Sequence, residues 1–385
     1  LLPLLAGIRR SAARTIRNNN ILGSVCAHLC PVEKLCEKEC SINALEHSID
    51  IAGLQRFACD YGQKNHLEPI EKVDSKKEKI AIIGAGPAGL SCAFELAKIG
   101  YHITIFEKET APGGIARWNI PDYRLPQETM TADLSCLENL SITFQYESSI
   151  TSPDKLNELL ASNFKAVFIG IGLGQPTELP LFQHYTNVMN YFDFLYDVKT
   201  NQEENKVKNR SVIVLGGGSV SMDAACTAAA MGAKKVTVIY RRSKNEMPAD
   251  HEEIQLADQL NVNFKTNSIL TEVIADKNKI IAVKGTEIEW KNKNESMPIN
   301  NSEFSLNADL IIQAIGTKPD DALLKNLKRT KKGTIEINDR YQTSLEGVFR
   351  AGDVVNGGTT IAQAVGEGKK AAKSINEFIN AGETS

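Results

Sequence analysis

Three features are absent from this sequence, and each absence argues against a class of protein. No stretch approaches the roughly 20 consecutive apolar residues that a membrane-spanning helix needs. No Cys-x-x-Cys pair occurs among the eight cysteines, which argues against a thiol–disulfide reductase with that redox motif. The formal net charge of −3 indicates no basic surface for nucleic acid. What is present, 385 residues of which 42% are hydrophobic, suits a globular protein of two or three domains.

The first residues resemble a secretory signal only superficially. Leu1-Leu2-Pro3-Leu4-Leu5 is apolar, but no basic residue precedes it and Arg9-Arg10 follow at once, whereas a secretory signal carries its charge before the apolar run. We interpret this stretch as part of a helix in a chain cut at its N-terminus. We therefore expect a cytoplasmic protein.

One local pattern occurs twice along the chain: a short buried strand, a glycine-rich turn, a helix and a second strand. The four elements of the first copy are 79–83, 84–89, 90–100 and 101–107. Those of the second copy are 211–215, 216–218, 222–232 and 235–240. A strand at 347–351 and a helix at 360–379 follow near the end of the chain.

Two such copies predict an α/β protein with two doubly wound, Rossmann-like dinucleotide-binding domains. Residues 1–75 contain short helices and loops, and the charged stretch 72–79 is a linker, so we expect a small α-helical domain before them. The first dinucleotide-binding domain is predicted to consist of 76–206 and 318–385. The second, 207–317, is inserted between these two segments.

The first glycine turn fits G-x-G-x-x-G, with Gly84, Gly86 and Gly89 at the fixed positions and Pro87-Ala88 between the last two. The glycines permit a tight turn, a close approach to a pyrophosphate and close packing of the helix. The free N–H groups and the dipole of the helix N-terminus attract the phosphates. Glu107, at the end of the next strand, is placed to accept the ribose hydroxyls. The alternative is a tight turn without a ligand.

Other pieces of sequence belong with this turn. Gly114 lies in a second glycine turn, Gly352-Asp353 ends a late strand, and Thr359-Thr360 precede the last helix. A carboxylate at a strand end can bind ribityl hydroxyls, and a helix N-terminus can stabilise reduced flavin. The combination resembles the superfamily of flavoproteins with two dinucleotide-binding domains, which implies FAD in the first domain.

The second glycine turn indicates a nicotinamide dinucleotide. Gly216-Gly217-Gly218-Ser219-Val220 is followed by Ser221, where a small residue replaces the third glycine. The next strand ends in Arg241-Arg242, and two guanidinium groups suit a 2′-phosphate, which favours NADPH over NADH. The alternative is a pair of solvated arginines. Ala314-Ile315-Gly316 forms another strand-end turn that is placed to line the nicotinamide pocket.

No acid or base is expected among the side chains that carry the reaction. Hydride transfer from a nicotinamide to a flavin requires proximity and orientation of the two rings. We therefore predict cofactor-binding residues and no catalytic residue.

Four of the cysteines lie close together, as Cys26-x3-Cys30-Pro-x4-Cys36-x3-Cys40. In a cytosolic chain such a cluster indicates metal binding before a disulfide framework. Zinc is one alternative. An iron–sulfur cluster is favoured, because a module with FAD and NAD(P)H needs an acceptor for single electrons.

The region from Cys26 to Phe57 resembles the N-terminal region of dihydropyrimidine dehydrogenase, especially its bacterial NAD-dependent flavin subunit, and of the glutamate synthase small subunit. The likeness runs from Asn20 to about Ile379. It implies that residues 1–75 are an iron–sulfur domain and that a [4Fe–4S] cluster has four ligands here. By the same resemblance Cys26 serves a second cluster that this chain does not complete, and Ile115 and Arg124 flank the FAD. The four implied ligands are Cys30, Cys36, Cys40 and Gln55.

The resemblance implies an electron-input subunit whose FMN-containing partner reduces uracil or thymine. Leu54-Gln55-Arg56-Phe57 favours the pyrimidine group, whereas Arg241-Arg242-Ser243 and Glu246-Met247-Pro248 are closer to the NADPH-using glutamate synthase small subunit, whose partner is the large subunit. Both alternatives stay open, as does the choice between NADP and NAD. A thiol reductase and a zinc-stabilised scaffold are less consistent with the motifs. We expect neither nucleic acid nor a membrane as a partner.

Overall fold

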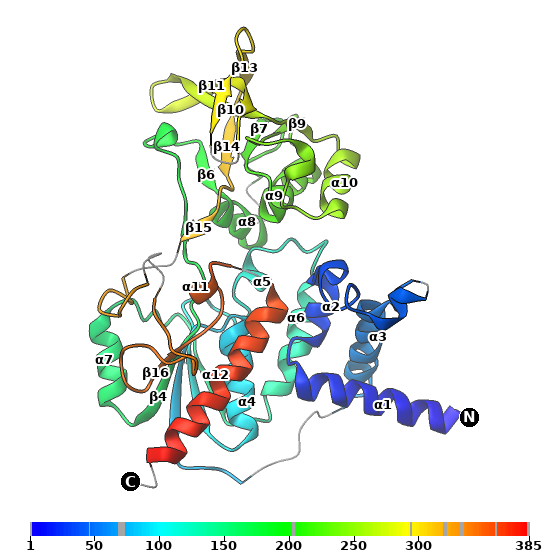
Figure 1. Ribbon diagram of the computed structural model, residues 1–385, viewed down its shortest axis with the longest axis vertical. Helices are drawn as coiled ribbons and strands as arrows, with labels where there is room; N and C mark the ends of the chain where they lie inside the picture. Colours follow the sequence, from blue (N-terminus) through cyan, green and yellow to red (C-terminus); the bar gives the residue numbers. More distant parts are fainter. Residues whose placement is uncertain are drawn as a thin grey trace. The chain divides into compact units, whose positions relative to one another are not determined.

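A computed structural model describes residues 2–45, 47–67, 74–201, 205–292, 295–318, 322–330, 335–358 and 360–382 (Figure 1). The chain divides into two compact units. The first unit consists of Leu1–Arg117, Asp122–Gly174 and Pro319–Ser385, and the second of Trp118–Pro121 and Gln175–Lys318.

The first unit is built on a parallel sheet of five strands in the order β16-β4-β1-β2-β3. Residues 80–83 of β1 are all buried, as expected for a strand that is covered on both faces. The strands are β1 (Lys79–Ile83), β2 (His102–Phe106), β3 (Ile142–Gln145), β4 (Phe164–Ile169) and β16 (Val348–Arg350).

Two long helices, α4 (Pro87–Lys98) and α12 (Ile361–Gly382), pack side by side in this unit (Figure 1). Their close approach depends on Gly368, because a Cβ atom there would lie 2.3 Å from the Ala88 carbonyl oxygen. The shorter helices of the unit are α5 (Ile115–Trp118), α6 (Gln127–Leu134), η3 (Ser135–Leu137), α7 (Pro153–Ala161) and α11 (Asp353–Asn356).

The first unit also contains a helical region before the sheet. Its α1 is longer than the short helices expected from the sequence, and it packs on α3. Asp50 caps α3, since its carboxylate accepts the Gly53 N–H at 2.7 Å. The helices are α1 (Leu2–Asn19), α2 (Gly23–Leu29), η1 (Val32–Lys34), η2 (Ser41–Ala44) and α3 (Ile51–Lys64).

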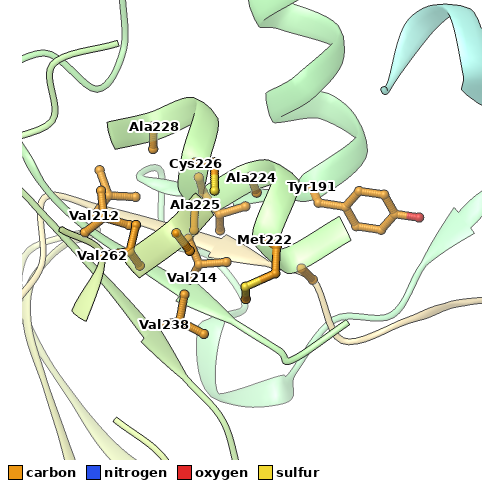
Figure 2. Close-up of a cluster of buried hydrophobic side chains, with 14 of the residues drawn as sticks. Tyr191, Val212, Val214, Met222, Ala224, Ala225, Cys226, Ala228, Val238 and Val262 are labelled. Carbon is orange, nitrogen blue, oxygen red and sulfur yellow. The ribbon is translucent and has the colours of Figure 1, made fainter. Parts of the chain in front are cut away.

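The second unit contains another five-stranded parallel sheet, in the order β6-β14-β7-β8-β9. Side chains of α8, α9 and the sheet form its core, which Figure 2 shows around Met222 and Val214. The elements are β6 (Val188–Asn190), α8 (Tyr191–Thr200), β7 (Ser211–Leu215), α9 (Ser219–Ala230), β8 (Lys235–Ile239), η5 (Lys244–Glu246), α10 (His251–Gln259), β9 (Asn263–Lys265) and β14 (Leu310–Gln313).

An antiparallel sheet extends the second unit, and the sequence interpretation did not anticipate it. Its long hairpin joins β10 to β11, and β11 also pairs with β12 and β13. The strands are β10 (Ser268–Asp276), β11 (Lys279–Trp290), β12 (Ser296–Pro298) and β13 (Phe304–Asn307). The remaining elements of the unit are β5 (Gln175–Pro176), β15 (Thr317–Lys318) and η4 (Pro180–Phe182).

The predicted fold class, two doubly wound nucleotide-binding sheets with a helical region before them, is confirmed. The helices after both glycine turns begin earlier than predicted, at Pro87 and Ser219. Residues 175–201 and 205–206, predicted in the first domain, lie in the second compact unit. None of the helices in the described part of the chain combines the length and apolarity that crossing a membrane requires.

Candidate functional site

The first glycine turn has a backbone that only glycine can supply. Gly84 has a φ of +96°, and an added Cβ would lie 2.7 Å from the Gly170 carbonyl oxygen. A Cβ on Gly89 would lie 2.0 Å from the Gly84 carbonyl oxygen. Gly86 is the N-cap of α4 and gives it no side-chain cap, and Pro87 follows in the first turn. A helix N-terminus without a side-chain cap can attract an anion, and binding of the FAD pyrophosphate at α4 stays a prediction.

Glu107 is buried at the end of β2 and holds two loops in place. One carboxylate oxygen accepts the Ala85 N–H at 2.7 Å, and the other accepts the Glu109 N–H at 3.0 Å. The carboxylate thus fixes the glycine turn. Its expected role as a ligand for ribose hydroxyls stays a prediction.

The structure brings the predicted flavin pieces of the first unit together. A Cβ added to Gly114 would lie 2.9 Å from Gly86 Cα, so the second glycine turn touches the first. A Cβ added to Gly352 would lie 3.0 Å from the Ala88 Cβ, so the end of β16 reaches the start of α4. Asp353 is the first residue of α11. Ile115, the first residue of α5, follows the second turn directly.

The C-terminal part of this site includes a residue that sequence reasoning missed. Glu367 on α12 accepts the Gly352 N–H at 2.8 Å and so connects α12 to the end of β16. Thr360 Oγ1 accepts the Gln363 N–H at 3.2 Å at the start of α12. Thr359, also predicted here, lies outside the described residues. Arg124 is half-buried in the stretch before α6.

The second glycine turn closes against the end of β14. A Cβ on Gly216, whose φ is +132°, would lie 2.2 Å from the Ala314 carbonyl oxygen. Buried Ser221 donates its hydroxyl to that same oxygen at 3.3 Å, so serine fills the place of the third glycine. Gly218 and Gly316 face open space, with nothing within 4 Å of an added Cβ.

The first turn of α9 begins at Ser219 and Val220, both half-buried, and Gly218 gives it no side-chain cap. Ile315 is half-buried between Ala314 and Gly316. The residues predicted for the nicotinamide dinucleotide thus lie at the carboxyl ends of β7 and β14, where doubly wound sheets bind nucleotides.

The two arginines after β8 have different environments. Arg241 is exposed. The Arg242 guanidinium lies over the Trp290 ring, 4.4 Å from its centroid, and 3.2 Å from a Glu246 carboxylate oxygen. Arg242 is therefore not a freely solvated side chain. No local signal marks Trp290, which comes from the far end of β11.

The cysteine-rich segment places Cys26 and Cys30 in direct contact on and just after α2. Their side chains are hydrogen-bonded, and Cys26 also accepts the Asn20 side-chain amide at 3.3 Å. The bond to Cys30 and burial raise the pKa of Cys26. The bond from Cys26 lowers the pKa of Cys30, with help from the backbone N–H of Ala362 in the first turn of α12.

Cys36 and Cys40 lie further along, near η1 and η2. Desolvation raises the pKa of the Cys36 thiol. The Ile49 N–H, and then those of Ile42 and Asn43, lower the pKa of Cys40. The side-chain amide nitrogen of Gln55 donates to the Gly23 carbonyl at 2.7 Å. A glutamine that ligates iron would use its side-chain oxygen, so this bond leaves the predicted ligand atom of Gln55 available.

Within the ranges that the structure describes, no three His, Cys, Asp or Glu side chains converge as a metal site would require. The chemistry of the sulfur atoms nevertheless fits an iron–sulfur cluster. Backbone N–H groups stabilise the thiolate forms of Cys30 and Cys40, and thiolates are the ligands that such clusters take. The second glycine turn fits a dinucleotide, because Gly218 and Gly316 face open space.

Charged side chains of α4, α12 and α6 contact the ends of α1 and α2. Lys98 of α4 and Lys369 of α12 donate to the carbonyls of Asn18 and Asn19 at the C-terminus of α1, at 2.9 and 2.7 Å. Asp133 of α6 contacts the N-terminus of α2. Each charge faces the helix end of opposite partial charge.

Asp133 accepts the Val25 N–H at 2.9 Å and is 1% exposed. Desolvation raises its pKa to about 6, although bonds from Val25 and Ser24 act in the opposite direction. No sequence motif indicated a role for Asp133, because Val25, whose N–H it accepts, lies 108 positions away.

Two protein-family models match the chain. The model for pyridine nucleotide-disulphide oxidoreductases matches residues 78–368. The model for dihydropyrimidine dehydrogenase domain II, with a 4Fe-4S cluster, matches residues 5–67.

Curated relatives match over nearly the whole chain. The NAD-dependent dihydropyrimidine dehydrogenase subunit PreT of Escherichia coli O157:H7 is 37% identical over 96% of this chain and 85% of its own length. The NADP(+)-dependent formate dehydrogenase subunit beta of Moorella thermoacetica is 32% identical over 95% of this chain and 55% of its own length.

Among solved structures, thioredoxin reductase of Lactococcus lactis matches with a TM-score of 0.62 and 22% identity, over 79% of this chain and 100% of that one. This likeness shows the fold. The family model over residues 78–368 and the 37% identical relative show the family as well. The chain belongs to the pyridine nucleotide-disulphide oxidoreductase family, and it is an NAD(P)H-dependent oxidoreductase that binds FAD, NAD(P) and a 4Fe-4S cluster.

Proposed function

We propose that this chain is the electron-input subunit of a dihydropyrimidine dehydrogenase. It takes electrons from NAD(P)H and delivers them to a separate FMN-containing subunit that reduces uracil or thymine. The observation that carries the proposal is the packing of α2, which Cys30 directly follows, on α12, which joins the cysteine-rich segment to the candidate flavin site in one compact unit. The PreT relatives, named as subunits of such an enzyme, support the substrate class.

Each predicted site has a role in this proposal. In the first unit, the two glycine turns, Glu107, Ile115, Arg124, Asp353 and Thr360 bind FAD. In the second unit, the turn at 216–220, Arg241, Arg242 and the turn at 314–316 bind the nicotinamide dinucleotide. Cys30, Cys36, Cys40 and Gln55 hold a 4Fe-4S cluster, and Cys26 serves a second one.

The chemistry of the bound groups is the cofactors' own. FAD can accept two electrons as a hydride and release them one at a time. It can therefore connect NAD(P)H, which donates two electrons together, to iron–sulfur clusters, which accept one electron each. Saturating the pyrimidine C5–C6 double bond consumes two electrons and two protons, so one NAD(P)H and one proton balance each turnover. The protein contributes binding and orientation, and no side chain has to act as an acid or base at the flavin.

An NADPH-dependent electron donor like the glutamate synthase small subunit is the second candidate. The geometry around Arg241 and Arg242 favours it in one respect, because one exposed and one stacked guanidinium line the loop where a 2′-phosphate would bind. Several relatives are also named for NADP(+) or NADPH. Only the partner and the preferred nucleotide separate the two candidates.

An anaerobic titration of the purified protein tests the proposal. We expect flavin bands over a broad iron–sulfur shoulder, and bleaching of the flavin on addition of NADH or NADPH. Adding the partner subunit and uracil should then reoxidise the flavin with formation of dihydrouracil. Bleaching without reoxidation by uracil, but with reoxidation by glutamine and 2-oxoglutarate through a glutamate synthase large subunit, would transfer the chain to the second candidate. A protein without a flavin band would contradict both.

A further inference from the structure

The turn at the end of β16 is fixed by hydrogen bonds to both polar backbone groups of Gly352. This residue has a φ of +83° and a ψ of −163°, a conformation that is essentially restricted to glycine. Its N–H donates to a carboxylate oxygen of Glu367 at 2.8 Å, and its carbonyl accepts the Val355 N–H at 2.8 Å. Asp353 follows at once, half-buried between buried Gly352 and Val354. The orientation of Gly352 therefore determines where Asp353 lies.

Glu367 makes the first of these bonds from α12, and both of its carboxylate oxygens are engaged. Oε2 accepts the Gly352 N–H, while Oε1 accepts the side-chain amide of Gln363 at 3.0 Å. Gln363 in turn donates its backbone N–H to Thr360 Oγ1 at 3.2 Å. A row of polar contacts thus connects Thr360, at the start of α12, to the end of β16. Thr360 and Gly352 are both predicted to bind FAD.

Close packing fixes the part of α12 that carries Glu367. A Cβ atom added to the neighbouring Gly368 would lie 2.3 Å from the Ala88 carbonyl oxygen in the first turn of α4. A Cβ added to Gly352 would lie 3.0 Å from the Ala88 Cβ. The start of α4, the end of β16 and α12 therefore meet at Ala88. Because α12 has no room to come closer, a shorter side chain at position 367 would lose the bond to Gly352.

We propose that Glu367 is a positioning residue for FAD, which accepts the Gly352 N–H and thereby holds Asp353 where its carboxylate binds the ribityl hydroxyls. This inference rests on the proposed role of Gly352 and Asp353 in FAD binding. Glu367 acts through the turn and needs no contact with the cofactor. Its role depends on an acceptor oxygen at the correct reach, and its negative charge is not required.

Two substitutions separate reach from charge. Glu367→Gln keeps the length of the side chain and an acceptor oxygen but removes the charge, and Gln363 can turn its amide to match. Glu367→Asp keeps the charge but is shorter by one methylene group. We expect Glu367→Asp to raise the dissociation constant for FAD about tenfold, because a hydrogen bond to a charged group contributes roughly this factor. Glu367→Gln should raise it by less than about threefold, since a neutral acceptor keeps the bond.

Serial dilution of the FAD-loaded full chain, followed by the fluorescence of the released flavin, measures each dissociation constant. Glu377→Asp is the matched control, because it makes the same change on the same helix at an exposed side chain, 4.0 Å from Lys373. This control should bind FAD like the wild type. Weak binding by Glu367→Gln with normal binding by Glu367→Asp would show that the charge matters and overturn the inference. Equal constants for the two variants, or the same loss in the control, would overturn it as well.

A double-mutant cycle with Asp353→Ala tests whether Glu367 acts through Asp353. Asp353→Ala alone should weaken FAD binding about tenfold or more. Adding Glu367→Asp to it should cause less than about a twofold further loss, because the group to be positioned is already absent. A further loss of about tenfold would show an independent contribution and contradict the inference. Normal FAD binding by Asp353→Ala would instead refute the proposed role of Asp353, and this inference with it.

Discussion

The buried carboxylate that docks the cysteine-bearing helix should make the stability of the protein depend on pH in an unusual direction. Asp133 is 1% exposed, and among the described residues its Oδ1 has no hydrogen-bond partner. Burial raises its pKa from 3.8 to about 6. The folded chain therefore binds this proton more tightly than the unfolded chain.

The sign and the size follow from linkage. Below pH 3.8 the carboxyl is protonated in both states, and its contribution to the free energy of unfolding is greatest. As the pH rises through about 6 the folded protein must bury a charge, and this contribution is lost. A shift of about two pKa units corresponds to about 3 kcal/mol, a large share of the stability of an ordinary domain.

Asp133→Asn replaces the carboxylate by a neutral group of the same shape. At pH 8 we expect the variant to be more stable than the wild type by up to about 3 kcal/mol, with the gap closing toward pH 4. Urea unfolding, followed by circular dichroism from pH 4 to 8, measures this. Glu138→Gln, an exposed carboxylate shortly after Asp133, is the control. A variant less stable than the wild type at pH 8 would refute the reasoning and show that the charge on the α2 N-terminus outweighs its desolvation.

Three further predictions concern the cofactors. Ala362→Pro removes the N–H that contacts Cys30, at a helix position where proline is tolerated. It should lower the reduction potential of the cluster by roughly 40 mV, because a hydrogen bond contributes about 1 kcal/mol. In an electron paramagnetic resonance titration, Ala362→Gly should leave this potential unchanged. Gly84→Ala should abolish FAD binding, since its Cβ would meet a backbone oxygen at 2.7 Å, whereas Gly172→Ala, also at positive φ but in open space, should retain the flavin bands. Cys40→Ser should remove the iron–sulfur absorption and keep the flavin; an intact cluster would exclude Cys40 as a ligand.

Local patterns in the sequence were sufficient for the elements of the two nucleotide-binding sheets. The strands at 79–83 and 211–215 have the predicted bounds, because a run of β-branched residues before a glycine turn has few other conformations. The helices start earlier than predicted, at Pro87 and Ser219. A helix can begin directly on a glycine N-cap, and the hydrophobic pattern that was used to locate it starts only one turn later.

The parts that could not be predicted depend on long-range contacts. The hairpin β10–β11 contains charged residues on its exposed positions, and it pairs through register shifts that no local rule specifies. Trp290 meets Arg242 only because the end of β11 returns to the loop after β8. Glu367 reaches Gly352 by the same kind of return, from α12 to the end of β16. In each case the sequence contains the chemical group but not its partner.

The docking of the helical region shows why these long-range contacts matter for electron transfer. The α1 C-terminus receives two ammonium groups, from Lys98 and Lys369, and the α2 N-terminus receives the Asp133 carboxylate. Because these three groups come from α4, α12 and α6 of the first unit, they fix the segment between α1 and α2 relative to α12. Cys30 directly follows α2 and contacts the first turn of α12. The position of Cys30 is thus determined by contacts with the part of the first unit for which we propose FAD binding, as electron transfer between the two proposed redox sites requires.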